Sequence, residues 1–202
     1  LSLSMAEHYT PTSRRPIAQV LRRSADAVTR WCVNRGVHPD TISYASIVVS
    51  AGAGAAFWQS GHRAWLVIPA VLLCYLRLWL NMLDGMVALS SGKASRRGEI
   101  LNELPDRASD ILIFTGVAHS GLCHPSPAYW AIIFALLTAY AGTFGQAIGA
   151  GRQFAGVMAK PWRMVVLHMG AWLQVGLLWS GAPVYYGGLT IVDWTLLLII
   201  AG

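Results

Sequence analysis

Charge is the property this sequence has least of. Of its 202 residues only 12% are charged, whereas 55% are hydrophobic. Because a soluble domain usually carries about twice that charged fraction, the composition argues against a soluble globular protein. It predicts an integral membrane protein. Nine tryptophans and twenty glycines agree with this, since Trp collects at membrane interfaces and Gly is frequent in transmembrane helices.

Cysteine is scarce too. Cys32, Cys74 and Cys123 are far apart and odd in number, so they offer neither a disulfide framework nor metal-ligand spacing. We interpret them as small buried residues. The N-terminal stretch is polar and basic and lacks the apolar run of a cleavable signal peptide.

Apolar runs with helical periodicity predict an all-α integral membrane fold, a six-transmembrane-helix bundle preceded by an amphipathic interfacial helix. A flexible N-terminus (1–13) leads into the amphipathic helix (14–36). The six arginines of that helix favour anionic head groups, although an ordinary surface helix is the alternative. The transmembrane bundle then covers 37–202. Its predicted helices are 41–59, 64–89, 98–120, 128–149, 163–180 and 190–202.

The last predicted helix has only 13 residues, whereas a bilayer needs about 20. We therefore expect it to be truncated, short or tilted. A run of small residues at 51–56 in the first transmembrane helix predicts close packing against a neighbour.

Basic residues are distributed unevenly among the predicted loops. The N-terminal arm carries six, the 90–97 loop three and the 150–163 loop three, while the opposite turns carry only Arg63. The positive-inside rule then places the N-terminus and both basic loops on the cytoplasmic side. The expected location is the cell membrane, in bacteria the inner membrane.

Polar residues form a stripe on the two helices that flank the 90–97 loop. On the first helix, positions i, i+3, i+4 and i+7 are Asn81, Asp84, Gly85 and Ala88. On the second, successive i+4 steps give Gly98, Asn102, Asp106 and Asp110. Each set shares one helix face, so antiparallel packing would bring the two faces together as a cytoplasmic pocket lined by carboxylates and amides.

The chemistry of this stripe points to a metal and phosphate site. Each ionisable residue inside an apolar helix costs about 2.5–3.5 kcal/mol on insertion scales. Pairing with Arg77 and Arg107 is the structural alternative, and it accounts for two of the carboxylates. Oxygen ligands on facing helices suit Mg²⁺ or Mn²⁺, and Gly85 and Gly98 would let a bulky ligand approach the backbone.

The same residues resemble the signature of the CDP-alcohol phosphotransferase family (CDP-alcohol phosphatidyltransferases). That signature reads D-x-x-D-G-x-x-A-R, eight residues, then G-x-x-x-D-x-x-x-D, and this sequence keeps its spacing from Asn81 through Asp106. The segment HPDTIS is similar to the family's P-N-x-[ST] start, with Asp40 in place of Asn. Three signature positions differ: Asn81 and Asn102 replace Asp, and Leu89 replaces Arg.

The resemblance implies a membrane enzyme of phospholipid biosynthesis. Such an enzyme moves the phosphoryl-bearing group of a CDP-linked lipid or alcohol to the hydroxyl of a small or phosphorylated alcohol and releases CMP. The resemblance implies a second copy in a homodimer as well. Because the positive charges flank apolar segments, we expect membrane lipids and not nucleic acid as their partner.

The resemblance also implies roles for individual residues. Asp106 would be the catalytic base that deprotonates the acceptor. One or two Mg²⁺ or Mn²⁺ ions would bind at the signature positions Asn81, Asp84, Asn102 and Asp106. The nucleotide would contact Asp84, Gly85, Ala88 and Gly98.

Asn81 and Asn102 offer carbonyl oxygens but no charge, so a metal is lost or weakened, or neighbours compensate. Asp110, one turn beyond Asp106 on the same face, is our candidate for a compensating metal ligand. Glu103 is rotated about 100° away from Asn102 on an unkinked helix.

The second basic loop supplies Arg152, Lys160 and Arg163 on the side of the predicted site. Such a cluster suits a phosphate on the acceptor or a lipid head group. Positive-inside anchoring is the alternative interpretation.

Two other functions fit parts of the sequence. The altered signature allows a catalytically impaired relative that binds the CDP-linked lipid without turnover. Acidic residues inside the membrane also mark ion paths, which allows a small ion or solute transporter.

Overall fold

The computed structural model describes residues 18–93, 103–149 and 160–202, with the backbone alone for 18–24 and 160–161. Several predictions lie outside the described residues: those for residues 1–13 and for Gly98, Asn102 and Arg152, and the side-chain role of Lys160.

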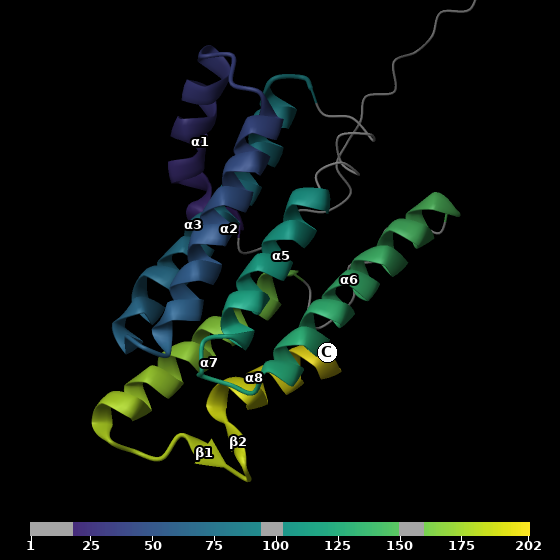
Figure 1. Cartoon of the computed structure of the whole chain (residues 1–202). Coiled ribbons are helices and arrows are strands. Elements are labelled where there is room, and N and C mark those ends of the chain that lie inside the picture. The colour runs from purple at the N-terminus through teal and green to yellow at the C-terminus, as the bar shows by residue number, and fades with distance from the viewer. Residues whose placement is uncertain (1–17, 94–102, 150–159) are drawn as a thin grey trace, which may run out of the picture.

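Helices make up most of the described chain (Figure 1). In chain order they are α1 (Ala18–Asn34), α2 (Pro39–Ser60), the 3-10 turn η1 (Ala64–Leu66), α3 (Val67–Ser90), α5 (Glu103–Ala118), α6 (Pro125–Ala147), α7 (Lys160–Ser180) and α8 (Ile191–Ala201). The mostly helical fold was predicted.

A short β-hairpin between α7 and α8 was not predicted. Strands β1 (Tyr185–Tyr186) and β2 (Leu189–Thr190) pair antiparallel. Gly187 and Gly188 both have positive φ, 61° and 81°, and this conformation reverses the chain in two residues.

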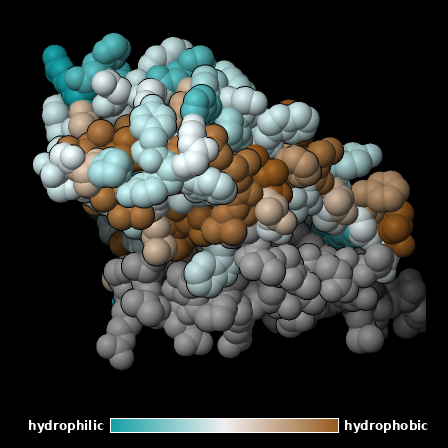
Figure 2. Space-filling model, turned by 90° about the horizontal axis from the view of Figure 1, so that it is seen from below, coloured by the Kyte–Doolittle hydropathy of each residue, from teal (hydrophilic) through white to brown (hydrophobic). Residues whose placement is uncertain are grey.

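Three described segments are long and apolar enough to cross a membrane: Pro39–Ser60, Ala64–Ser90 and Pro125–Ala147. Helix α8 is apolar but shorter. Apolar side chains also cover much of the outer face that Figure 2 shows. Leu72, Leu137 and Leu198 are each more than half exposed. A soluble monomer rarely exposes apolar surface of this extent, whereas lipid covers it at no cost.

Helix α2 packs against both α3 and α5 (Figure 1). Its contact with α5 is a backbone contact: a Cβ on Gly116 would overlap the carbonyl oxygen of Gly54, and one on Gly61 would overlap that of Ser120. The close packing predicted for the small residues at 51–56 is confirmed at Gly54. This crossing fixes where α5 lies along α2.

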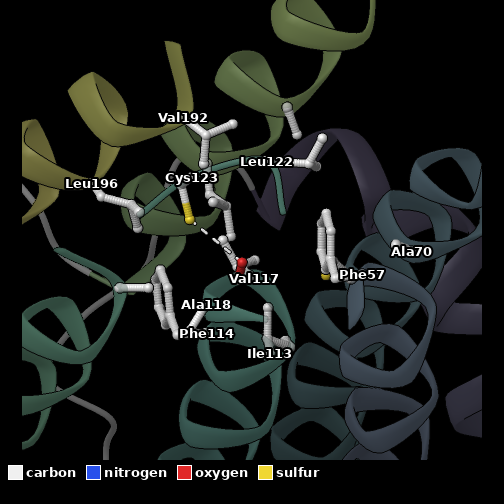
Figure 3. Packing of buried hydrophobic residues seen from close by; sticks show 14 of the residues in the cluster. Phe57, Ala70, Ile113, Phe114, Val117, Ala118, Leu122, Cys123, Val192 and Leu196 are labelled. Atoms are coloured by element: carbon white, nitrogen blue, oxygen red, sulfur yellow. Dashed lines mark hydrogen bonds between the residues drawn. The ribbon is translucent and has the colours of Figure 1, made fainter. Parts of the chain in front are cut away.

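The main apolar core joins α2, α3, α5, α6, α7 and α8. Figure 3 shows Phe57, Phe114 and Leu196 among its buried side chains. All three cysteines are buried and unpaired, as predicted. In the turn between α5 and α6, burial raises the pKa of the Cys123 thiol to about 12, and the protonated thiol donates to the Val117 carbonyl at 3.4 Å (Figure 3).

A smaller apolar cluster seats α1 on α3. Cys32 of α1 packs in it with Leu83 and Val87 of α3 and with Ile42 of α2. Trp31, by contrast, is 56% exposed. One face of α1 is therefore covered by protein, and its position in a membrane interface stays a prediction.

Candidate functional site

The two halves of the polar stripe meet at Asn81 of α3 and Asp106 of α5. The Asn81 amide Nδ2 donates a hydrogen bond of 2.6 Å to Asp106 Oδ1. Asp106 is only 5% exposed. This contact across 25 residues of sequence brings the predicted faces of the two helices together.

Asp84 lies one turn further along α3 and is 3% exposed. Its Oδ2 accepts a hydrogen bond of 2.7 Å from the hydroxyl of Ser43, in the first turns of α2. Three helices therefore build the site, because α2 contributes the Ser43 side chain to the residues of α3 and α5. The sequence analysis did not identify Ser43 as a site residue. Its position at the end of HPDTIS, the segment similar to the family's start, could have pointed to it.

Arg77 is completely buried, one turn before Asn81 on α3. Its Nη2 lies 3.1 Å from Asp106 Oδ1 and 3.4 Å from Asp110 Oδ1, and it also donates to the Asp106 backbone carbonyl at 3.3 Å. The structural pairing considered for Arg77 is confirmed, and it engages two carboxylates at once.

Three guanidinium groups surround Asp110, which is 1% exposed. Besides the Arg77 contact at Oδ1, its Oδ2 lies 3.6 Å from Arg107 and 3.6 Å from Arg163 of α7. Arg107 also pairs with Glu103 at 3.2 Å, so the structural pairing considered for Arg107 is found as well. The contacts just given join Asp110 to arginines, so it serves here to hold α3, α5 and α7 together.

Arg163 is the described member of the predicted acceptor-binding group. It is 5% exposed and reaches the same carboxylate as Arg77, so the structure brings it to the edge of the site.

The described residues leave space beside the backbone directly after Asp84. A Cβ built on Gly85 would meet none of their atoms within 4 Å, and Ala88, one turn further, is partly exposed. Leu89, at the signature arginine position, is 49% exposed. The predicted nucleotide-contacting positions on α3 thus border a region where a ligand can approach the main chain.

The donor set limits what metal the site can hold. Within residues 18–93, 103–149 and 160–202, no three His, Cys, Asp or Glu side chains are grouped as a metal site. The Asp84 carboxylate beside the open backbone of Gly85 suits one divalent ion that takes its other ligands from phosphates and water. A second ion at Asn81 and Asp106 does not fit, because Asp106 Oδ1 already accepts N–H donors from Asn81 and Arg77.

Comparison with known proteins gives several relatives, although no protein-family model matches the chain. An inner membrane protein of Escherichia coli, YnbA, is 29% identical over 164 residues, 76% of this chain and 81% of that protein. The archaetidylinositol phosphate synthase of Pyrococcus horikoshii is 21% identical over 149 residues, 74% of this chain and 77% of the synthase. The phosphatidylinositol phosphate synthase of Mycolicibacterium smegmatis is 28% identical over 154 residues, 73% of this chain and 67% of the synthase.

The fold is similar to that of a solved membrane enzyme. The phosphatidylinositol phosphate synthase PgsA1 of Mycobacterium tuberculosis, crystallised with CDP-DAG, matches with a TM-score of 0.71 at 18% identity over 89% of this chain and 87% of that one. The same enzyme with manganese and citrate matches with a TM-score of 0.70 at 18% identity, over 88% and 82%. Together with the three apolar spans, these relatives make the chain an integral membrane protein.

Proposed function

Because this chain belongs to the CDP-alcohol phosphotransferase family, we propose that it transfers the phosphoryl-bearing group of a CDP-linked lipid or alcohol to an acceptor hydroxyl. CMP is the second product. The synthases among its relatives and the structural match to an enzyme crystallised with CDP-DAG support a reaction of phospholipid biosynthesis.

The observation that carries the proposal is the contact between Asn81 and Asp106. It joins the two halves of the signature with their spacing intact, and it does so beside Asp84 and the open backbone of Gly85. A buried carboxylate pair next to accessible main chain suits a ligand that combines phosphates with a nucleoside.

Each residue has a definite task in this reaction. The cytidine and its phosphates lie along Asp84, Gly85 and Ala88, with Gly98 completing the nucleotide contact. Ser43 holds the Asp84 carboxylate in one orientation through its hydrogen bond, as Asn81 and Arg77 do for Asp106.

The transfer step forms one P–O bond and breaks another at the same phosphorus. The acceptor oxygen bonds to the phosphorus that carries the alcohol, the P–O bond of the pyrophosphate breaks, and CMP leaves. The Asp106 carboxylate takes the acceptor's hydroxyl proton.

Asp84 is the described residue best placed to hold a Mg²⁺ or Mn²⁺ ion, with Asp106 and Asn102 as further candidates. The bound ion supplies charge neutralisation on the pyrophosphate and the leaving CMP. Manganese in the related PgsA1 structure supports the choice of metal. Asp110 is engaged by three arginines, so we assign it charge balance in place of metal ligation.

The acceptor side of the site carries the positive charge. Arg163 borders it, and Arg152 and Lys160 precede Arg163 in the chain. These three residues bind a phosphate of the acceptor or of a lipid head group.

The membrane arrangement proposed from the sequence has six crossings, α1 in the cytoplasmic interface, and the N-terminus and site facing the cytoplasm. In this arrangement 37–202 is the catalytic bundle and pairs with a second copy. Reactivity of single introduced cysteines toward an impermeant maleimide tests the orientation.

CMP release tests the reaction itself. Purified protein in lipid nanodiscs is given CDP-diacylglycerol, Mn²⁺ and a panel of acceptors, including glycerol phosphate, inositol phosphate and serine. We expect CMP with at least one acceptor, and a rate lower by at least about 100-fold in Asp106→Asn, because the general base is lost. Asp26→Asn makes the same chemical change on α1, outside the signature and outside the contacts described for the site, and should keep the parent rate.

A catalytically impaired binder is the second candidate, because the oxygen that would receive the proton shares its carboxylate with two N–H donors. Metal-dependent retention of CDP without CMP release from any acceptor would favour it. Ion flux into liposomes at a rate that does not change when CDP is added would favour a transporter instead.

A further inference from the structure

Arg77 occupies an unusual position for a charged side chain. It leads the largest side chains that are fully buried in the described part of the molecule, and its exposed fraction is 0%. A buried ion costs several kcal/mol in desolvation unless excellent partners offset that cost. Arg77 Nε and Nη1 have no hydrogen-bond partner among the described residues, so its contacts are concentrated at Nη2.

Those contacts fall on the carboxylates of the site. Nη2 lies 3.1 Å from Asp106 Oδ1 and 3.4 Å from Asp110 Oδ1, so one nitrogen bridges two carboxylates one turn apart on α5. A divalent ion held by these carboxylates would supply positive charge in the same way.

Asn81 completes this arrangement from the next turn of α3. Its side chain is oriented with the NH₂ group toward Asp106 Oδ1 at 2.6 Å, because its carbonyl oxygen at that distance would face another negatively charged oxygen. Asn81 thereby acts as a donor to a carboxylate, where an aspartate would act as a ligand to a cation. Arg77 and Asn81 together give Asp106 Oδ1 the positive partners that a metal would give it.

The local charges favour one metal ion. Asp84 and Asp106 are the two carboxylates at the signature positions that the structure describes, and Asn81 contributes none. With the Arg77 guanidinium at Asp106, a second divalent ion would face a fixed positive charge and few negative ligands.

We propose that Arg77 is a resident cation that takes the place of one divalent ion, so that the site binds a single Mg²⁺ or Mn²⁺ on the Asp84 side. The inference rests on the proposed function, since it concerns the metal of that same site. Arg77 acts through Asp106 and is therefore a positioning residue.

Metal stoichiometry tests the inference without depending on turnover. The full chain in detergent, with saturating CDP, is titrated with Mn²⁺, and free Mn²⁺ is counted by electron paramagnetic resonance. One tight ion per chain is expected. Two ions would overturn the inference and leave the proposed function standing, whereas none would overturn both.

Two variants test whether Arg77 determines the number of Mn²⁺ ions bound per chain. In Arg77→Gln/Asn81→Asp the resident cation is gone and the missing carboxylate is restored, so the count should rise twofold, from one ion to two. A count of one in the folded double variant contradicts the inference. Arg77→Lys keeps a positive charge and should still bind one ion.

Arg107→Gln/Asn81→Asp is the matched control. Arg107 also pairs with carboxylates of α5, Glu103 and Asp110, but Arg77 stays in place, so one ion is expected. Two ions in this control would show that Asn81 alone sets the number and would overturn the role of Arg77. If the Arg77→Gln double variant does not fold, the parent count still tests the inference, because two ions in the parent would overturn it.

Discussion

Two buried aspartates, Asp193 at the start of α8 and Asp110 in α5, have very different surroundings. Asp193 accepts four hydrogen bonds at 2.7–3.0 Å, two from His124 and two from Thr190. Asp110 has ion pairs at 3.4–3.6 Å, and its Oδ2 has no hydrogen-bond partner among the described residues.

This difference distinguishes the structural network around Asp193 from the region of the candidate site around Asp110. Around Asp193 the polar groups satisfy one another, and Gln174 extends the network by bonding to Leu122 and Val192. Nearly all buried polar groups in proteins are paired. Asp110 and Arg77 are held mainly by charge, and each keeps a side-chain atom without a hydrogen-bond partner among the described residues, which sets their surroundings apart from those of Asp193.

Of the variants that test this difference, Asp193→Ala should have the largest effect, a loss of stability. Removing this carboxylate leaves the buried donors of Thr190 without an acceptor and breaks both hydrogen bonds from His124, which should lower the free energy of unfolding by about 4 kcal/mol. Thermal unfolding in detergent measures the loss, and metal-dependent CDP binding at low temperature should be unchanged. Weaker CDP binding with normal stability would contradict the division into scaffold and site.

Asp84→Asn should have the reverse pattern. Loss of a carboxylate ligand should weaken Mn²⁺-dependent CDP binding by about 100-fold, or about 2.7 kcal/mol, in isothermal titration. Stability should change little, because the amide can still accept the Ser43 hydrogen bond. Parent-like affinity in this variant, with Asp26→Asn as the control, would exclude Asp84 from the site.

Gly116→Ala tests the helix crossing between the two regions. The added methyl would overlap the Gly54 carbonyl, so α2 and α5 must separate at a cost of about 2 kcal/mol. Gly142→Ala on α6 is the matched control, since a Cβ there meets no atom of the described part of the chain within 4 Å. Equal melting temperatures for the two variants would show that the crossing is not close.

Ser43→Ala should have the smallest effect, about 10-fold weaker metal-dependent CDP binding, because it removes the group that orients Asp84. Ser50→Ala is its control: Ser50 is buried on the same helix and bonds to the Ser46 carbonyl. Similar affinities for the two variants would mean that Ser43 does not orient the carboxylate.

The sequence predicted the parts of the site that follow helical periodicity. Asn81 and Asp106 meet because each lies on a face defined by i+3 and i+4 spacing, and the bounds of α2 and α3 follow Pro39 and the apolar runs. The packing at Gly54 was also predictable, because small residues permit close approach of helices.

What the sequence did not predict depends on how helices rotate against each other. Ser43 reaches Asp84 because of the way α2 is rotated and placed against α3. Arg77 was considered as a structural partner, but its contact with both Asp106 and Asp110 depends on the depth of α5. The hairpin at 185–190 is too short to produce an alternating pattern.

CMP release before and after metal removal tests the central claim most directly. The parent protein in nanodiscs with CDP-diacylglycerol and its best acceptor should release CMP with Mn²⁺, stop when a chelator is added, and resume when Mn²⁺ is restored in excess. No CMP from the folded protein with any acceptor, or a rate that the chelator leaves unchanged, would contradict a metal-dependent CDP-alcohol phosphotransferase.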